Sequence, residues 1–144
     1  MPDENRLSPE QVSALLDAAR AARAKAYVPY SRFPVGAALL TRDGTLYHGC
    51  NVENASFGLT NCAERTAFFR AIADGHQPGD FVALAVVGDT EGPIAPCGAC
   101  RQVMLELGGA ALPVILGNLA GAVASTDAAA LLPGAFAPND LPRA

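Results

Sequence analysis

The chain has 144 residues and a mass of 14.7 kDa, with 51% hydrophobic residues, 17% charged residues and a formal charge of −4. This length and apolar content suit one domain over residues 1–144 and exclude intrinsic disorder. A pI of about 5.0 and ten scattered basic residues argue against a nucleic acid polymer or an anionic membrane as partner. Neither a basic leader nor a long apolar run is present, so we expect a soluble, cytoplasmic protein.

The first third of the chain predicts a helix, an ordered loop and a β-hairpin. Residues 8–25 begin with a helix cap and a capping box, and apolar residues then recur at helical spacing. Residues 27–34 combine prolines with aromatic side chains, which is typical of a structured loop. Strands are expected over residues 35–41 and 45–50, joined by a tight turn at Asp43-Gly44.

The middle of the chain alternates polar loops with regular elements. Residues 51–61 form a polar loop, and residues 62–73 have the pattern of a helix. Residues 81–88 are a continuous, valine-rich run, as expected of a strand that is buried on both faces. A second loop over residues 89–96 leads into a predicted helix over residues 97–107.

The last third predicts two strands and a short helix. The strands cover residues 112–116 and 122–125, and the helix covers residues 127–132. The resulting order αββαβαββ, followed by the small helix, indicates an α/β fold in which helices lie on the faces of one mixed sheet.

Four cysteines, at positions 50, 62, 97 and 100, leave the chemistry open. Without a secretory leader we expect reduced thiols, which favours metal binding or catalysis over disulfides. Cys62 and Cys97 stand where a polar loop becomes a helix, and the free N–H groups there stabilise thiolates. Cys97 and Cys100 are three positions apart, so both sulfurs can face one ion. With Cys62 as a third ligand, a tetrahedral Zn²⁺ keeps one position open for water, as catalytic sites do.

Glu64 follows Cys62 by two positions and can reach that water without binding the metal. A carboxylate at this place can take a proton from the water and return it to a leaving group. Three thiolates and one dication sum to about −1, which weakens the effect of the metal on its water. Arg65 and Arg101 adjoin the cysteines, and we expect them to offset this charge by hydrogen bonding to sulfur.

Two other interpretations of the cysteines stay open at this point. A Cys-x-x-Cys pair also fits a thioredoxin-like redox site, although this leaves Cys62-Ala63-Glu64 unexplained. A closed structural zinc site with Cys50 or His48 as fourth ligand would make the chain a binding module. Cys50 better fits an inert, packed thiol at a strand end, and His48 and His76 better fit surface or hairpin positions than ligand positions.

Five segments together carry a resemblance to a known family: residues 30–39, 49–56, 62–67, 96–102 and 131–136. On these segments, and over nearly the whole chain, the sequence resembles the small, homotetrameric cytidine deaminases with three zinc-binding cysteines. The resemblance implies a three-layer α/β/α sandwich around a mixed five-stranded sheet. It also implies one Zn²⁺ per subunit, held by Cys62, Cys97 and Cys100.

The implied activity is the hydrolytic deamination of cytidine and 2′-deoxycytidine to uridine and 2′-deoxyuridine, with release of ammonia, in pyrimidine salvage. Glu64 would move protons from the zinc-activated water to N3 and to the amino group that leaves C4. Asn51 and Glu53 would hold the ribose, the carboxylate accepting from the 3′-hydroxyl. The backbone of Ala63 would meet the pyrimidine.

Aromatic side chains complete the implied pocket. Phe33 and Phe136 would wall it, with Phe136 reaching the site of a neighbouring subunit. Phe57 is a departure, because relatives commonly carry a tyrosine there, and a hydroxyl available to the ribose is therefore missing. A deaminase of the blasticidin S class is the alternative enzyme, although Asn51-Val52-Glu53-Asn54 favours a ribose.

Overall fold

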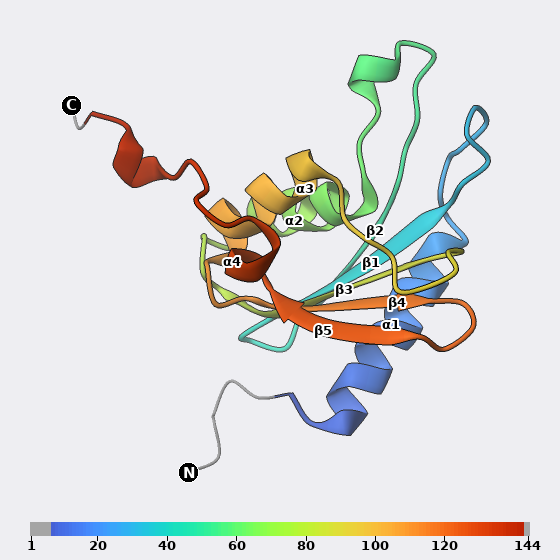
Figure 1. Cartoon of the computed structure of the whole chain (residues 1–144), viewed down its shortest axis with the longest axis horizontal. Helices are drawn as coiled ribbons and strands as arrows, with labels where there is room; N and C mark the ends of the chain where they lie inside the picture. Colours follow the sequence, from blue (N-terminus) through green and yellow to red (C-terminus); the bar gives the residue numbers. More distant parts are fainter. Residues whose placement is uncertain (1–6, 143–144) are drawn as a thin grey trace.

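A five-stranded mixed sheet forms the centre of the computed structural model, which describes residues 7–142 (Figure 1). The strands are β1 (Val35–Thr41), β2 (Leu46–Cys50), β3 (Phe81–Gly88), β4 (Pro113–Asn118) and β5 (Val123–Asp127). They lie in the order β2-β1-β3-β4-β5, with β3 and β4 parallel and the other neighbours antiparallel. The predicted α/β fold with a mixed five-stranded sheet is confirmed.

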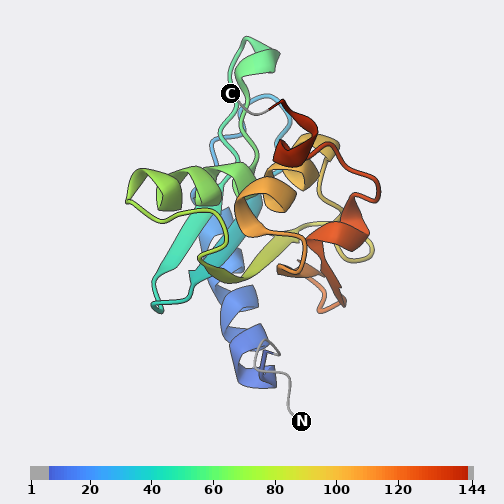
Figure 2. The ribbon, with the colours of Figure 1, turned by 90° about the vertical axis from the view of Figure 1, so that its left-hand side faces the viewer.

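Helices cover both faces of this sheet (Figure 2). They are α1 (Pro9–Arg23) on one face and α2 (Ala63–Ala73), α3 (Gly98–Val103) and α4 (Ala128–Leu131) on the other. The helix predicted over residues 97–107 changes at its middle, because Met104–Gly108 is a π-helical turn. Among the described residues, no helix is long and apolar enough to cross a membrane.

The central strand β3 explains why its sequence is apolar throughout. Leu84 and Val86 pack among the side chains of α2 and α3, whereas Ala83, Ala85 and Val87 pack against α1. Successive side chains of a strand point to opposite faces, so a strand between two helical layers needs apolar residues at every position. The expected three-layer arrangement therefore follows from two cores on either side of one sheet.

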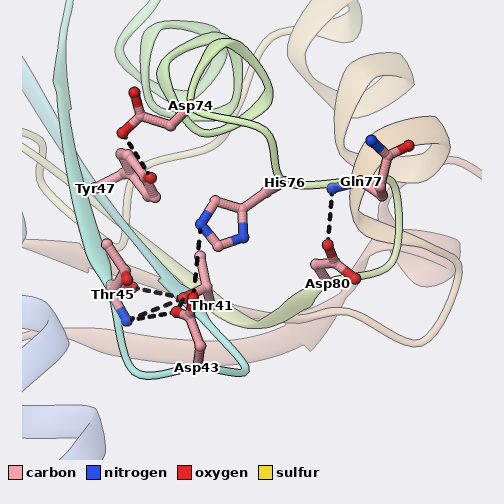
Figure 3. Close-up of polar contacts among 8 residues, drawn as sticks. All are labelled: Thr41, Asp43, Thr45, Tyr47, Asp74, His76, Gln77 and Asp80. Carbon is pink, nitrogen blue, oxygen red and sulfur yellow. Dashed lines mark hydrogen bonds and ion pairs between the residues drawn. The ribbon is translucent and has the colours of Figure 1, made fainter.

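Polar contacts tie the β1–β2 hairpin to the C-terminal end of α2 (Figure 3). The hydroxyl of Tyr47 donates to Asp74 Oδ2 at 2.8 Å. The ring of His76 stands edge-on to Tyr47, at 5.5 Å between centroids, and its Nε2 lies 4.0 Å from Asp43 Oδ2. A hydrogen bond from Thr41 is the main cause that lowers the pKa of Asp43 to about 2. The half-buried ring of His76 therefore packs against the hairpin from the segment that follows α2.

Two glycines allow helices to lie unusually close to the sheet. A Cβ on Gly49 of β2 would stand 2.2 Å from the carbonyl oxygen of Ala63 and 2.7 Å from the nitrogen of Ala67. A Cβ on Gly36 of β1 would stand 1.9 Å from the carbonyl oxygen of Ala19 in α1. Both helices touch strand backbone at these points, and Gly49 places the first turn of α2 beside the end of β2.

We expect Gly49→Ala to lower the free energy of unfolding by about 1–3 kcal/mol, since the new methyl group meets backbone that cannot move aside. Urea denaturation followed by circular dichroism measures this change. Gly58→Ala is the matched control, because a Cβ there meets no atom within 4 Å. Equal stability of the two variants would show that the close approach of α2 to β2 is not a constraint.

Candidate active site

Three cysteine side chains meet at the N-terminal ends of α2 and α3. Cys62 and Cys97 are the N-cap residues of these helices, and Cys100 lies in the first turn of α3. The three sulfurs all lie within 4.8 Å of one another, and Sγ of Cys62 is 3.7 Å from Sγ of Cys97. All are free thiols, with Cys97 exposed and Cys100 fully buried. The cluster therefore extends from the core to the surface.

This donor set fits a zinc ion. Sulfur ligands at a Zn–S distance of about 2.3 Å stand about 3.8 Å apart in a tetrahedron. The separation of 3.7 Å between the sulfurs of Cys62 and Cys97 agrees with that value. Three thiolates leave a fourth position for water or substrate, which distinguishes catalytic from closed structural zinc sites.

The two side chains considered as a fourth protein ligand lie elsewhere. Tyr47 and Gly49 of β2 face α2, so the alternation along the strand directs His48 and Cys50 to the opposite face. Within residues 7–142, Cys62, Cys97 and Cys100 form the only cluster of three or more potential metal ligands, and it includes neither Cys50 nor His48. The geometry thus contradicts a closed site completed by Cys50 or His48. Cys50 is a half-buried free thiol at the strand end.

The two arginines beside the cluster behave differently. Arg65 donates from Nη2 to the sulfur of Cys62 at 3.2 Å. Arg101 instead donates to the backbone carbonyls of Pro96 and Leu131, at 2.8 and 2.9 Å, so the expectation that it hydrogen bonds to sulfur is wrong. Hydrogen bonds from the Cys100 thiol, and then from Arg65, hold the pKa of Cys62 well below its usual range.

A cavity of about 440 Å³ opens beside the cysteines. Its lining includes the sequence-predicted residues Phe33, Asn51, Cys62, Ala63, Glu64 and Cys97. Glu64, in the first turn of α2, is only 4% exposed. Burial raises the pKa of Glu64, and the neighbouring Cys62 raises it further. A carboxyl group that holds its proton closer to neutral pH, next to a candidate metal position, is suited to proton transfer.

Asn51 and Glu53 both hold loops in place. Asn51 Oδ1 accepts from the backbone N–H of Val35 at 2.8 Å, and its Nδ2 donates to the carbonyl of Phe33 at 2.8 Å. Glu53 Oε1 accepts from the N–H groups of Tyr30 and Ser31 at 3.0 and 3.1 Å. Hydrogen bonds from Ser31 lower the pKa of Glu53, which keeps this carboxylate ionised.

Not all of the predicted substrate contacts line one cavity. Glu53 belongs to an adjacent hollow, which it shares with Phe57 and Tyr30, and the rings of these two aromatics stand edge-on at 6.0 Å. Phe57 lies on the loop that extends beyond the sheet between β2 and α2 (Figure 1). Phe136 lies in the C-terminal segment, 59% exposed, and lines neither space.

Besides Val35 at the start of β1, three cavity residues escaped the sequence interpretation: Thr90, Ile94 and Ala95. They belong to the loop over residues 89–96, which follows β3 and ends at the first cysteine of α3. Their position in the sequence could have indicated their role, because loops at the carboxyl ends of parallel strands commonly line binding sites. Their side chains carry no distinctive chemistry, so residue type alone did not single them out.

Comparison with known proteins agrees with this geometry. Residues 9–116 match the cytidine and deoxycytidylate deaminase zinc-binding region. Cytidine deaminase from Sporosarcina psychrophila is 59% identical over 130 residues, which are 90% of this chain and 94% of that protein. The crystal structure of cytidine deaminase from Burkholderia pseudomallei has 63% identity and a TM-score of 0.86, and the match covers 90% of this chain and 100% of that one. That from Mycobacterium tuberculosis has 44% identity and a TM-score of 0.73, covering 86% and 95% of the two chains.

These matches define the class of protein as a hydrolytic deaminase with a zinc-binding region. The chain belongs to the cytidine and deoxycytidylate deaminase family, as its sequence motifs predicted. The thioredoxin-like interpretation of Cys97 and Cys100 is thereby wrong.

Glu64→Gln is expected to stabilise the metal-free chain at neutral pH, because it removes a buried ionisable group. The pKa of Glu64 is raised in the folded state, so its ionisation opposes folding above the pKa of the unfolded chain, near 4.5. The gain in melting temperature should be present at pH 7 and should disappear below about pH 4. Thermal unfolding of both chelator-treated proteins across this pH range measures it. A gain that did not change with pH would contradict the origin in ionisation.

Proposed function

We propose that the chain catalyses the hydrolytic deamination of cytidine and 2′-deoxycytidine to uridine and 2′-deoxyuridine, with release of ammonia. The observation that carries the proposal is a single cavity lined by two of the clustered cysteines, Cys62 and Cys97, and by the buried carboxyl group of Glu64. Cytidine deaminases with 59% and 63% identity over 90% of the chain support it. We place the reaction in pyrimidine salvage in the cytoplasm, where four free cysteines stay reduced.

Cys62, Cys97 and Cys100 would hold one Zn²⁺ per subunit. When bound, such an ion acts as a Lewis acid and lowers the pKa of water toward neutrality. Arg65 serves this site by placing a positive charge against the sulfur of Cys62, with which it forms a hydrogen bond of 3.2 Å. The charge partly offsets the negative charge of three thiolates, which would otherwise weaken the Lewis acid.

Glu64 is the proposed catalytic acid and base. It accepts a proton from the attacking water and delivers it to N3 of the cytosine ring, while the water oxygen bonds to C4. It then transfers a second proton from that oxygen to the amino group, and the bond from C4 to nitrogen breaks. The products are ammonia and uridine, which together contain all the atoms of cytidine and water. Burial raises the pKa of Glu64, which makes the protonated form accessible for both deliveries.

The cavity suits an uncharged nucleoside. The ring of Phe33 offers a stacking surface to the base, and the backbone of Ala63 offers polar groups to its edge. The side chains of Asn51 and Glu53 face the ribose in this proposal, with the Glu53 carboxylate accepting from the 3′-hydroxyl. The lining described within residues 7–142 contains no lysine or arginine, which favours a nucleoside over a nucleotide.

Phe136 contributes to the proposal only through a second copy of the chain. It is 59% exposed and stands outside the cavity of its own subunit. We propose a homotetramer in which Phe136 walls the site of a neighbour. Phe136→Ala should then raise KM for cytidine without loss of zinc, and light scattering should give a tetramer for the wild type. A fully active monomer would contradict the shared site.

Glu64→Gln is expected to keep its zinc and to lose cytidine turnover by several orders of magnitude. Each of two proton transfers depends on this carboxyl group, and general acid–base catalysis contributes about 10²–10⁴-fold per group. A spectrophotometric assay of cytidine, together with zinc analysis, provides the measurement. Turnover near that of the wild type would remove Glu64 from the mechanism.

Two cysteine variants serve as matched controls for this experiment. Cys62→Ala should lose zinc and activity together, whereas Cys50→Ala should keep both, because Cys50 faces the other side of the sheet. Zinc lost from Cys50→Ala and kept by Cys62→Ala would overturn the catalytic site. Parallel assays of deoxycytidine and blasticidin S, with and without a chelator, determine the substrate class. Turnover of blasticidin S alone would replace the proposed substrate.

A further inference from the structure

Asn118, the last residue of β4, is a fully buried polar side chain that joins two loops. Its Nδ2 donates to the carbonyls of Thr90 and Glu91, each at 2.9 Å. Its Oδ1 accepts from the N–H groups of Ala120 and Ala122, at 3.0 and 2.8 Å. A side-chain amide has two N–H donors and two acceptor lone pairs, so the hydrogen-bonding capacity of Asn118 is filled.

The two donor bonds end on the loop that walls the candidate active site. β3 and β4 are parallel, and Gly88 is the register partner of Asn118, so the loop over residues 89–96 leaves the sheet beside this side chain. A second contact between the same segments runs from the N–H of Ile94 to the carbonyl of Gly117, at 3.3 Å. The loop is thus attached to the end of β4 near its start and near its end.

The anchored loop contributes directly to the cavity surface. Thr90, Ile94 and Ala95 line the cavity, and the next residues lead to Cys97. A Cβ on Gly88 would stand 2.5 Å from Cδ1 of Ile94 and 3.6 Å from Cζ of Phe33. Ile94 and Phe33 therefore both pack over the end of β3, and a displaced loop would alter the surface that faces a base.

We propose that Asn118 is a positioning residue for the deamination, acting on nucleoside affinity through the loop over residues 89–96. Its two donor bonds set the position of the cavity wall, while its two acceptor bonds hold the β4–β5 turn. Asn118 itself is not among the residues that line the cavity. Asparagine suits this place because a residue of the same size with donors alone or acceptors alone would leave one of the two loops unpaired. The kinetic part of this inference rests on the proposed function, whereas the structural part rests on the loop contacts alone.

Asn118→Asp separates the two roles. The carboxylate keeps both acceptor bonds to the turn but has no donor for the carbonyls of Thr90 and Glu91. We expect KM for cytidine to rise about tenfold or more, with kcat per bound zinc changed less than KM, because two hydrogen bonds to the cavity wall are lost. Amide hydrogen exchange should accelerate in residues 89–96 and stay unchanged in residues 120–122.

Two further variants make the test specific. Asn118→Ser puts one hydroxyl group in place of the amide and adds no charge, so it should raise KM less than Asn118→Asp does. It should replace that variant if Asn118→Asp does not fold. Tyr47→Phe removes a hydrogen bond at the far end of the sheet, between Tyr47 and Asp74 (Figure 3). It should lower the melting temperature while KM and the exchange of residues 89–96 stay as in the wild type.

Each outcome bears on the inference. Wild-type KM and wild-type exchange in residues 89–96, in folded Asn118→Asp or Asn118→Ser, would overturn it, even with a lowered melting temperature. A wild-type protein that did not deaminate cytidine would contradict the proposed function. In that case, hydrogen exchange still tests the anchoring of the loop: faster exchange in the Asn118 variants supports it, and unchanged exchange overturns it.

Discussion

The rest of the site depends on the electrostatic problem of four acidic groups in one small volume. The sulfurs of Cys62, Cys97 and Cys100 lie within 4.8 Å of one another, and Glu64 is buried beside them. A hydrogen bond to Cys62, together with burial, raises the pKa of Cys100, whereas burial and then the nearby Cys62 raise the pKa of Glu64. Arg65 contributes one positive charge, which is too little for three thiolates. A dication among the sulfurs would relieve this repulsion, and the chain belongs to a family described by its zinc-binding region.

The topology of the sheet brings the segments that carry these cysteines close together. Gly36 pairs with Cys50 at the end of β2, and Val35 pairs with Gly88 at the end of β3, so both strands leave the sheet at one edge. The helices that follow them, α2 and α3, consequently begin near each other. Without a side chain on Gly49, the first turn of α2 can lie against the backbone of β2. Backbone geometry thus brings together N-cap cysteines that are 35 positions apart in sequence.

What the sequence predicted depended on local patterns. Local interactions determine the helical periodicity, the capping box at Ser8 and the apolar run of β3. The corresponding helix and strand occur where they were expected. Cys62 and Cys97 were recognisable because a cysteine at a loop-to-helix junction has a local chemical meaning. The partners of Arg101 and the packing of His76 were not predictable, since each depends on segments distant in sequence. The π-helical turn after α3 likewise has no local signal that distinguishes it from a longer α-helix.

In the proposed function, the same polar side chains would both order loops and contact the ligand. Asn51 fixes the backbone on both sides of Pro34, and thereby the ring of Phe33, while its own amide borders the cavity. Glu53 uses Oε1 to order the backbone at Tyr30 and Ser31. Side chains that are already held in this way lose little conformational entropy when a ligand arrives, which favours binding by a small, uncharged molecule with few contacts. If Asn51 holds the ribose as proposed, its replacement by alanine would combine two effects, a released loop and a lost ligand contact. Only substitutions that remove the donor or the acceptor of this side chain one at a time can separate the two effects.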